Sequence, residues 1–395
     1  MRQNDIAPHL RQYLVPVDGK RNVRAMRAPP TPRRLPPGAS SPDLAHAASQ
    51  ALGRLSGAMQ EWNNPDILTR TLARREAVQS SQIEGTKTDL DELLTYEATL
   101  SAEGFPTDVR TTKHYVEALQ HGLSAVRAAG RDALGCGLVN DIHAILMQDE
   151  SVPKGVYREV QAWIGTGRIE DASFVPTPPL MIDACMQDLE RSMLRYARHE
   201  EEQGELTVIA QMAIAHAQFE TIHPFNDGNG RTGRILMPLI LAAENLPPLY
   251  LSGMLMRHQA GYYAALKQVQ LQGDWRPWMD MVYRAVIEAS ADWLSLADDL
   301  RLIAKTWAER TATYRRHSVA SRLPPLLIDH PVVTASNVAG LLDVSPVAAT
   351  KGINELVSLG ILRARDERKW GRSFHAHAVL ERLNQAPDDS PRPRW

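Results

Sequence analysis

The sequence has few cysteines, no long apolar run and no large surplus of one charge. Its two cysteines, Cys136 and Cys185, lack the spacing of metal ligands, so neither a disulfide framework nor a zinc module is supported. The longest apolar runs, such as 235–243, are too short to cross a bilayer. No apolar segment follows the basic start of the chain, which argues against a secretory signal. These absences favour a cytoplasmic protein without a membrane span.

The 395 residues are 44% hydrophobic and carry a formal net charge of −2. That apolar content is sufficient for two or three domains, and the balanced charge gives no overall attraction to nucleic acid or anionic lipid. Residues 1–34 differ, because they hold eight basic side chains, two acidic ones and five prolines. This composition predicts an extended or disordered basic arm, more typical of a solvated leader than of a nucleic-acid-binding tail.

From about residue 41 the pattern is helical, and long strand-like alternation is absent. The clearest helix is expected over 205–222, where Val208, Met212, Ala215, Phe219 and Ile222 recur at steps of four and three. Glycines and prolines interrupt the pattern over 151–180, which predicts a loop with a short hairpin. The predicted organisation is a basic arm over 1–40, an N-terminal helical region over 41–107, a core over 108–318, a C-terminal domain over 333–384 and a loose tail over 385–395.

The C-terminal domain follows a proline-rich stretch, 321–331, that we interpret as a linker. Ser345 is expected to cap a helix that begins at Pro346 and ends before Gly360, after a shorter helix and a turn. The following residues have room for a two-stranded wing, so the pattern predicts a winged helix-turn-helix. Its second helix carries one base, Lys351, and one acid, Glu355, which is a poor electrostatic footprint for DNA.

The wing is more basic than that helix. It contains five basic side chains and two acidic ones (Arg363, Arg365, Arg368, Lys369 and Arg372, with Asp366 and Glu367). We favour protein docking or dimerisation over DNA binding for this domain.

The segment with the clearest chemistry runs from His223 to Arg234, at the end of the predicted 205–222 helix. Its glycines allow backbone amides to approach an anion, and a new helix begins directly afterwards with its positive end at the loop. Arg231 and Arg234 are three residues apart and can reach one polyanion from one helix face. Asp227 is a hard oxygen ligand suited to Mg²⁺, and His223 can accept a proton near neutral pH. The set suits attack of a hydroxyl on a magnesium-bound nucleotide.

This segment resembles the Fic family signature, His-x-Phe-x-Asp/Glu-Gly-Asn-Gly-Arg-x-x-Arg, at every specified position. The segment from Gly155 to Arg158, followed by Trp163, Ile164 and Gly165, is similar to the family's flap. The resemblance implies an all-α fold, with a Fic-type helical core, a short β-hairpin flap and a C-terminal winged helix-turn-helix domain. It also implies adenylylation, the transfer of AMP from ATP to a Tyr, Thr or Ser hydroxyl of a target protein.

The resemblance assigns a role to each motif residue. His223 would be the general base and Asp227 would bind Mg²⁺, while Phe225 would anchor the loop. The phosphates would be bound by an anion hole and two arginines (Gly228, Asn229 and Gly230, then Arg231 for the β-phosphate and Arg234 for the γ-phosphate). Tyr262 and Tyr263 are candidates for the adenine site, although only one of them can face it. Trp163, Ile164 and Gly165 would dock the target by strand pairing.

A second match implies regulation. The segment from Ser80 to Gly85 fits the family's inhibitory pattern, Ser/Thr-x-x-x-Glu-Gly/Asn, so Glu84 would pair with Arg234 and Ser80 would steady the helix. Occupying that guanidinium would prevent productive binding of the γ-phosphate.

Three further possibilities stay open from the sequence. The same site could remove AMP from a modified protein, or use another nucleotide donor, or sense nucleotide in a DNA-binding regulator. Fic relatives also suggest a homodimer. Two histidines in apolar helices, His143 and His216, are interpreted as satisfied core or surface residues rather than catalysts.

Overall fold

The computed structural model describes residues 5–61, 65–99, 106–198, 206–365 and 372–385. The described chain is largely helical, as expected, and it divides into two compact units. Unit one comprises Met1–Gly57, Gln79–Gly85 and His114–Ala289, and unit two comprises Ala58–Val78, Thr86–Lys113 and Ser290–Trp395. This division differs from the predicted boundaries at 107 and 318, because helices α1, α2, α4 and α11 each contribute residues to both units.

The helices in chain order are α1 (Pro42–Gln60), α2 (Pro65–Ile83), α3 (Leu90–Thr99), α4 (Thr107–Ala129), α5 (Cys136–Leu146), α6 (Pro179–Leu189), α7 (Val208–Ile222), α8 (Asn229–Ala243), α9 (Ser252–Arg257), α10 (Gln259–Gln272), α11 (Arg276–Thr311), α12 (Val319–Arg322), α13 (Ala335–Leu342), α14 (Pro346–Ser358) and α15 (His377–Asn384). Short 3-10 or π turns join several of them: η2 (Pro8–Tyr13), η3 (Gly130–Ala133), η4 (Ile169–Asp171), η5 (Glu190–Leu194) and η6 (Pro324–Ile328).

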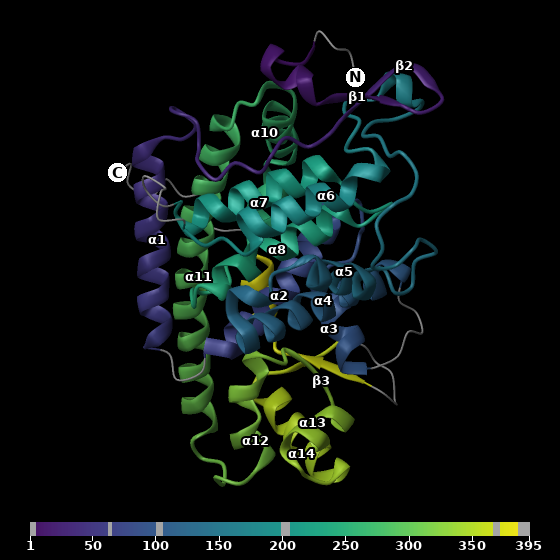
Figure 1. Cartoon of the computed structure of the whole chain (residues 1–395). Helices are drawn as coiled ribbons and strands as arrows, with labels where there is room; N and C mark the ends of the chain where they lie inside the picture. The colour runs from purple at the N-terminus through teal and green to yellow at the C-terminus, as the bar shows by residue number, and fades with distance from the viewer. Residues whose placement is uncertain (1–4, 62–64, 100–105, 199–205, 366–371, 386–395) are drawn as a thin grey trace. The chain divides into compact units, whose positions relative to one another are not determined.

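Helix α7 is the centre of unit one and packs along α8, and both are drawn in teal (Figure 1). The Thr207 hydroxyl caps α7 by accepting a hydrogen bond from the Ala210 N–H at 3.3 Å. The predicted helix is therefore confirmed, but its burial is more extensive than one face. Every residue from Ile209 to Phe219 is buried, because neighbouring helices cover α7 on all sides.

The N-terminal segment is folded, so the expectation of an extended or disordered arm is wrong. Strands β1 (Leu14–Val17) and β2 (Lys20–Met26) form an antiparallel hairpin that turns at Asp18 and Gly19, where Gly19 has a φ of 71°. The apolar side chains of the hairpin pack on the segment around η4 in one cluster (Val17, Val23, Ala25, Ile169, Ala172 and Val175). The prediction rested on the basic and proline-rich composition of the segment and did not take these apolar contacts into account.

The predicted flap hairpin is present. Ile164 and Phe174 form an antiparallel bridge, in which the Ile164 N–H donates to the Phe174 carbonyl at 2.8 Å. The Phe174 ring lies in a second cluster with the N-terminal segment and α10 (Ile6, Leu10, Met26 and Leu271). The folded N-terminal segment therefore supports the base of the flap.

In unit two, the stretch interpreted as a linker is instead packed structure. It forms the end of α12 and η6, and Leu323 and Leu327 are fully buried there. The hydrophobic positions of this stretch outweigh its prolines, which sit at the start of η6 where they are tolerated. The Arg70 side chain pairs with Asp329 at 2.7 Å and further ties α2 to this region.

The C-terminal elements occur in the predicted order. Strands β3 (Val332–Thr334), β4 (Arg363–Ala364) and β5 (Ser373–His375) form a three-stranded antiparallel sheet in the order β3-β5-β4. Helices α13 and α14 lie between β3 and β4 in sequence, and Ser345 caps α14 as predicted, accepting from the Ala348 N–H at 3.2 Å. The predicted wing residues 366–371 and most of the predicted tail, 386–395, lie outside the described residues.

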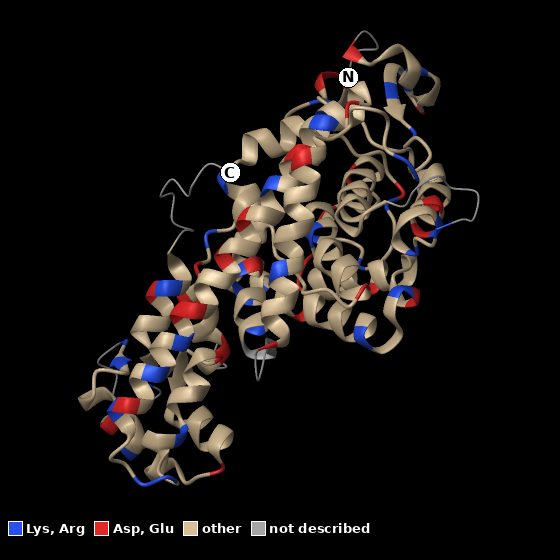
Figure 2. Ribbon diagram, turned by 90° about the vertical axis from the view of Figure 1, so that its left-hand side faces the viewer, with Lys and Arg blue, Asp and Glu red and all other residues tan. Residues whose placement is uncertain are grey.

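Acidic and basic side chains are interspersed along the helices of both units (Figure 2). Within the described part of the chain, no helix has the length and apolar character needed to span a membrane.

Candidate active site

The predicted motif forms a tight loop between α7 and α8. His223 ends α7 in the left-handed conformation with a φ of 52°, and its N–H donates to the Phe219 carbonyl at 2.8 Å. Gly228, with a φ of 75°, precedes the first residue of α8. Phe225 is completely buried between these two turns, which confirms its predicted role as the anchor of the loop.

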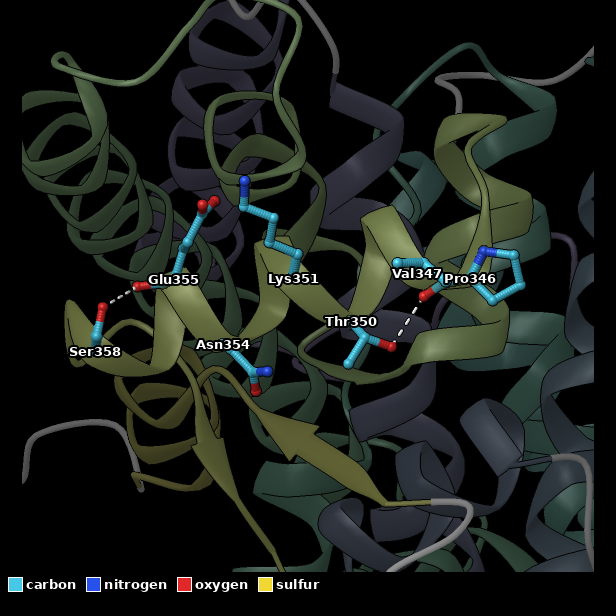
Figure 3. Close-up of a pocket in the computed structure, with 7 residues that line it drawn as sticks. All are labelled: Pro346, Val347, Thr350, Lys351, Asn354, Glu355 and Ser358. Atoms are coloured by element: carbon cyan, nitrogen blue, oxygen red, sulfur yellow. Dashed lines mark hydrogen bonds between the residues drawn. The ribbon is translucent and has the colours of Figure 1, made fainter.

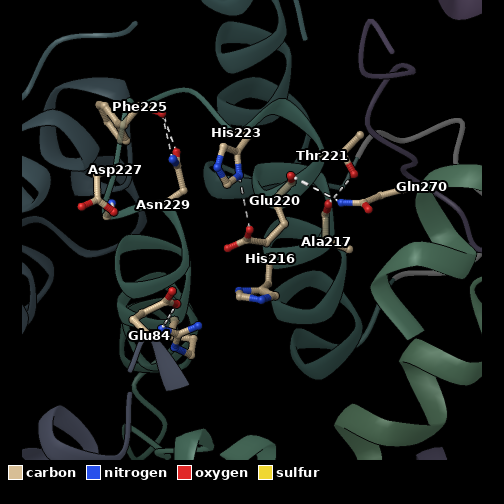
Figure 4. Close-up of polar contacts among 12 residues, drawn as sticks. Glu84, His216, Ala217, Glu220, Thr221, His223, Phe225, Asp227, Asn229 and Gln270 are labelled. Carbon is tan, nitrogen blue, oxygen red and sulfur yellow. Dashed lines mark hydrogen bonds and ion pairs between the residues drawn. The ribbon is translucent and has the colours of Figure 1, made fainter. Parts of the chain in front are cut away.

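Asn229 holds the loop rather than facing outward (Figure 4). Its buried side-chain amide accepts from the Phe225 N–H and donates to the Phe225 carbonyl, both at 2.9 Å. The side chain is therefore engaged with the loop backbone, and the groups left to meet an anion are the backbone amides of the first turn of α8. The sequence predicted this residue beside a phosphate, and it did not reveal the loop-holding role of its side chain.

His143 on α5 packs against the loop and bonds to its backbone. Its ring stacks on Phe225 with centroids 3.7 Å apart and planes 5° apart. The Gly155 N–H donates to Nδ1 at 2.9 Å, so Nε2 carries the hydrogen and donates to the Asp227 carbonyl at 3.0 Å. Burial lowers the pKa of His143 to about 4, so the ring is neutral at neutral pH. It is a satisfied core histidine, in agreement with the sequence interpretation.

Arg158 joins the flap to the motif loop. Its Nε donates to the His223 carbonyl at 2.9 Å, and its terminal nitrogens donate to the carbonyls of Val160 and Thr177. The side chain is buried, and burial lowers its pKa to about 10. A planar guanidinium suits this task because its donors diverge in fixed directions. The sequence placed Arg158 in the flap but gave it no function.

His223 has an acidic neighbour that the sequence analysis did not identify. Its Nδ1 lies 3.7 Å from Oε2 of Glu220, one turn earlier on α7, and the two side chains are 19% and 11% exposed. Figure 4 shows the imidazole directed toward this carboxylate. The spacing of three residues on one helix could have signalled the pair.

Arg231, in the first turn of α8, and Asp227, just before that helix, make few hydrogen bonds or ion pairs. The Arg231 guanidinium is buried, its Nε has no hydrogen bond within the described structure, and its nearest carboxylate oxygen, Oδ2 of Asp227, is 3.9 Å away. The Asp227 side chain is 61% exposed, and its Oδ1 accepts from the Gly228 N–H at 2.6 Å. A guanidinium pairs strongly with phosphate oxygens and a carboxylate can bind Mg²⁺, so these two side chains together could bind a metal-bound anion.

Asp227 fits the requirements of Mg²⁺ without a larger protein cage. Among the residues that the structure describes, no group of three or more His, Cys, Asp or Glu side chains could hold a metal ion. Mg²⁺ in phosphate sites is commonly bound by one or two carboxylates together with phosphate oxygens.

Arg234 is already paired. Its Nε donates to the Ser80 hydroxyl at 2.8 Å, and one terminal nitrogen donates to the Ser80 carbonyl at 3.1 Å and to Oε1 of Glu84 at 2.6 Å. Burial lowers the pKa of Arg234, but Glu84, Tyr262 and Tyr115 together raise it by more, so the net shift of the pKa is upward. The structure thus brings together the three residues of the predicted inhibitory contact. The Glu84 carboxylate also lies in contact with the position of a Cβ at Gly230, so only glycine leaves room for it.

The two tyrosines have different surroundings. Tyr262 is buried, and its hydroxyl bonds to Nε2 of His216 at 2.8 Å, which places it in the core rather than on the wall of an open site. Tyr263 is exposed on α10 and lies close enough to Glu84 and Arg234 for their charges to affect its pKa, which burial raises. Tyr263 is therefore the one that can meet a nucleotide.

The flap exposes apolar side chains. Trp163 and Ile164 are both partly exposed, and Gly165 follows with a φ of 127°. The backbone of Ile164 is already hydrogen-bonded within the flap. Its N–H donates to the Phe174 carbonyl at 2.8 Å, and its carbonyl accepts from the N–H groups of Ser173 at 2.9 Å and Phe174 at 3.4 Å. The three predicted flap residues are thus adjacent and accessible.

The exposed face of α14 forms an open hollow of about 710 Å³ (Figure 3). Lys351 and Glu355 project to the same side of the helix, so the one basic side chain of this face is accompanied by an acidic one. Val347 is also largely exposed there. This mixed surface matches the weak electrostatic footprint seen in the sequence, and the choice between protein docking and DNA binding stays a prediction.

Residues 43–124 match the family model described as Fic/DOC family N-terminal, and residues 134–241 match the Fic/DOC family model. A protein adenylyltransferase, fic-1 of Caenorhabditis briggsae, is 31% identical over 138 residues, which are 35% of this chain and 24% of that protein. A probable protein adenylyltransferase of Aquifex aeolicus is 28% identical over 199 residues, 50% of this chain and 55% of that protein. The chain thus spans about a quarter and about half of the lengths of these two relatives.

Two solved structures share the fold. A Fic family protein from Desulfovibrio desulfuricans has a TM-score of 0.52 at 18% identity, covering 87% of this chain and 98% of that one. A Fic domain containing signaling protein from Bacteroides thetaiotaomicron also has a TM-score of 0.52, at 19% identity, covering 64% of this chain and 97% of that one. The chain therefore contains a Fic/DOC family N-terminal domain over 43–124 and a Fic/DOC family domain over 134–241, and it shares the fold of these two solved Fic proteins.

Proposed function

We propose that this chain transfers AMP from ATP to a Tyr, Thr or Ser hydroxyl of a protein. The observation that carries the proposal is the buried Arg231 guanidinium, which has no close anion and lies on the first turn of α8, in the same loop as His223. A polyphosphate would supply the missing anion, and the positive end of α8 would add to its binding. The relatives named as protein adenylyltransferases support ATP as that polyphosphate.

Phosphate binding is divided among three groups in this proposal. The backbone amides at Gly228, Asn229 and Gly230 would meet the α-phosphate region, and Arg231 would bind the β-phosphate. Asp227 would hold Mg²⁺, which, when bound, neutralises charge on the phosphates. The left-handed turn at Gly228 brings these groups to one side of the loop.

The reaction itself requires one proton transfer. The target oxygen forms a bond to the α-phosphorus, its proton moves to the imidazole of His223, and the bond between the α-phosphorus and the oxygen leading to the β-phosphate breaks. Pyrophosphate leaves with the electron pair of that bond. Because phosphoryl chemistry depends mainly on positioning and charge neutralisation, a single base and a rigid anion site are sufficient. Tyr263 would lie at the adenosine end, and Trp163, Ile164 and Gly165 would hold the extended target segment.

The Glu84–Arg234 contact would act as a brake on this reaction. A guanidinium that already bonds a carboxylate at 2.6 Å is not available to a γ-phosphate, and Glu84 would have to move before ATP could bind productively. Glu84 is 36% exposed, so its displacement would not require opening the core. The contact with Gly230 places the same carboxylate against the proposed phosphate site, which adds direct repulsion of the nucleotide.

The test uses ATP labelled on the α-phosphate or on the γ-phosphate, with a cell lysate as the source of targets. We expect protein-bound α-label to increase about 5- to 150-fold in Glu84→Gly, the range of a coupling free energy of 1–3 kcal/mol. The double variant Glu84→Gly/His223→Ala should lose this label by about 10²- to 10⁴-fold, since general base catalysis contributes that much. The γ-label should not become bound to protein.

Glu61→Gly is the matched control, because Glu61 is an exposed glutamate that follows α1. It should leave labelling at the level of the unaltered protein. Equal labelling by Glu84→Gly and the unaltered chain would contradict the brake. Absence of α-label in every variant would contradict AMP transfer, and a loss of AMP from a pre-labelled target would instead favour hydrolytic removal of AMP, in which water replaces the protein hydroxyl on the α-phosphorus.

A further inference from the structure

Glu220 lies one turn before His223 and on the same side of α7, inside the protein rather than in solvent. Two polar atoms of this pair are buried and have no hydrogen bond within the described structure: Nδ1 of His223 and Oε1 of Glu220. The distance of 3.7 Å between His223 Nδ1 and Glu220 Oε2 is closed by a small rotation of either side chain. The pair is therefore positioned for a direct hydrogen bond.

The carboxylate has a place made for it between α7 and α8. A Cβ at Gly233 would lie 3.1 Å from Glu220 Oε1 and 3.2 Å from His216 Nδ1, so the glycine admits both polar atoms at the helix crossing. Phe219 borders the same position at 3.1 Å and keeps it apolar on the other side. Packing therefore fixes the position of the Glu220 side chain. A residue that orients another side chain must itself be held in place.

Charges around Glu220 keep it ionised. Burial raises its pKa, but the approach of the His223 imidazole and the charges of His216, His223 and Arg234 lower it more, so the net shift is downward. An ionised carboxylate accepts hydrogen bonds and cannot donate them. A neutral His223 facing it therefore carries its hydrogen on Nδ1 and presents the lone pair of Nε2 on the other edge of the ring.

The backbone of His223 is held as firmly as its ring. The left-handed turn at His223 is closed by its N–H to the Phe219 carbonyl, and the His223 carbonyl accepts from Arg158. With the main chain fixed on both sides, rotation of the side chain is the remaining freedom, and Glu220 is the group placed to restrict it (Figure 4).

We propose that Glu220 is a positioning residue that holds the His223 imidazole in the Nδ1–H form, with Nε2 directed to the target hydroxyl. This inference rests on the proposed AMP transfer. During the step, the hydroxyl proton moves to Nε2 as the oxygen bonds to the α-phosphorus and pyrophosphate leaves. The Nδ1 hydrogen stays on the ring, and Glu220 remains a carboxylate that stabilises the imidazolium.

The kinetic test compares Glu220→Gln and Glu220→Asp in the Glu84→Gly background. Glu220→Gln keeps the size of the side chain and removes its charge. We expect kcat to fall about a hundredfold, the lower end of the general-base contribution. The KM for ATP should stay within about twofold, because no phosphate contact is altered. Glu220→Asp should recover part of the lost kcat. Glu288→Gln, which removes the charge of an exposed pair with Arg257, is the control and should change neither constant.

An unaltered kcat in Glu220→Gln would overturn the inference, and so would an equal fall in Glu220→Gln and Glu220→Asp accompanied by loss of the folded circular dichroism spectrum in both. A second measurement, by NMR, does not depend on AMP transfer.

Long-range proton–nitrogen correlation spectra of protein labelled with ¹⁵N-histidine report which ring nitrogen of His223 carries the hydrogen. The variant His223→Asn identifies the signal of this residue.

We expect the Nδ1–H form in the unaltered protein above the titration range of histidine, and a mixture of forms in Glu220→Gln. Dominance of the Nε2–H form in the unaltered protein would overturn the role of Glu220 even if AMP transfer is observed. If no variant transfers AMP, the proposed function fails, while the spectra still decide whether Glu220 sets the form of His223.

Discussion

Arg231 carries a buried positive charge whose nearest negative partner is 3.9 Å away, and its remaining contact is a 3.6 Å approach to the Met147 sulfur. A charge in this setting is costly unless an anion binds to it. In the proposed function, the phosphates of a bound nucleotide would offset this cost.

Arg231→Lys tests that conclusion. Lysine keeps the charge but loses the planar fork, so we expect the Kd for Mg²⁺–ATP to rise about 10- to 150-fold in the Glu84→Gly background, the equivalent of one charged hydrogen bond. Isothermal titration calorimetry gives this value directly. Arg257→Lys, in the exposed pair with Glu288, is the control and should bind as the parent does. Equal affinity of the Arg231 variant and its parent would show that this side chain does not bind the nucleotide.

At the same scale, the sequence predicted the polar residues of the motif because their types and spacing are themselves the chemical pattern. The Ser80, Glu84 and Arg234 contact was also predicted, from a resemblance, and the three side chains are together in the structure. Glu220 and Gly233 were not identified. Their importance depends on how α7 and α8 cross. The sequence also left open which tyrosine lies in the core, because the hydrogen-bond partner of Tyr262, His216, is 46 positions away.

Among the elements, the N-terminal hairpin has the most direct effect on the site, because it supports the flap. The Met26 N–H donates to the Val175 carbonyl at 2.8 Å, next to the Phe174 ring in the shared apolar cluster. Asp18 and Gly19, between two short runs with alternating apolar residues, are a known hairpin signal. The basic and proline-rich composition of the segment outweighed this pattern in the prediction. The helix capped by Ser345 was predicted correctly, because its cap and its first proline are local signals.

Phe174→Ala should loosen the flap without unfolding the core. Loss of a buried phenylalanine costs about 3–5 kcal/mol, here concentrated in the cluster with Ile6, Leu10 and Met26. Hydrogen exchange of the Ile164 and Met26 amides, which bond across this region, should accelerate. The amides of α7 should keep their protection. Val347→Ala, on the exposed face of α14, is the control, and unchanged exchange at both flap amides would contradict the supporting role.

At the scale of the whole molecule, helical content and the family fold were predictable, but the division into units was not. The predicted boundaries lie at changes in composition, whereas the units divide within α1, α2, α4 and α11. A long helix gives no local sign that its two ends pack in different units. The stretch before the C-terminal strands shows the same limit, since buried Leu323 and Leu327 matter more there than the prolines beside them.

The stability of the whole chain should depend on pH through His216. Its ring is completely buried, bonded to Tyr262, stacked on Trp278 and near the charges of Glu220 and Arg234. Burial lowers its pKa in the folded state, so the unfolded chain binds more protons as the pH falls below the ordinary histidine range. The free energy of unfolding should then decrease with falling pH, by up to about 1.4 kcal/mol per pH unit.

Thermal melts between about pH 7.5 and about pH 5.5 measure this effect. His216→Gln does not titrate, so its Tm should change less over this range than that of the unaltered protein. His46→Gln, which replaces an exposed histidine of α1, is the control and should retain the full dependence. Identical slopes for His216→Gln and the unaltered protein would refute the assignment.

Because the backbone at His223 is left-handed, the residues that preserve the shape of the turn differ from those that could serve the proposed reaction. The proposed reaction requires an imidazole at this position, but the turn accepts glycine and asparagine more readily than alanine or any β-branched residue. An asparagine there would leave a correctly shaped but chemically silent loop. That makes His223→Asn better suited than an alanine variant to capturing nucleotide and target together, since it removes the base while preserving the surface on which both assemble.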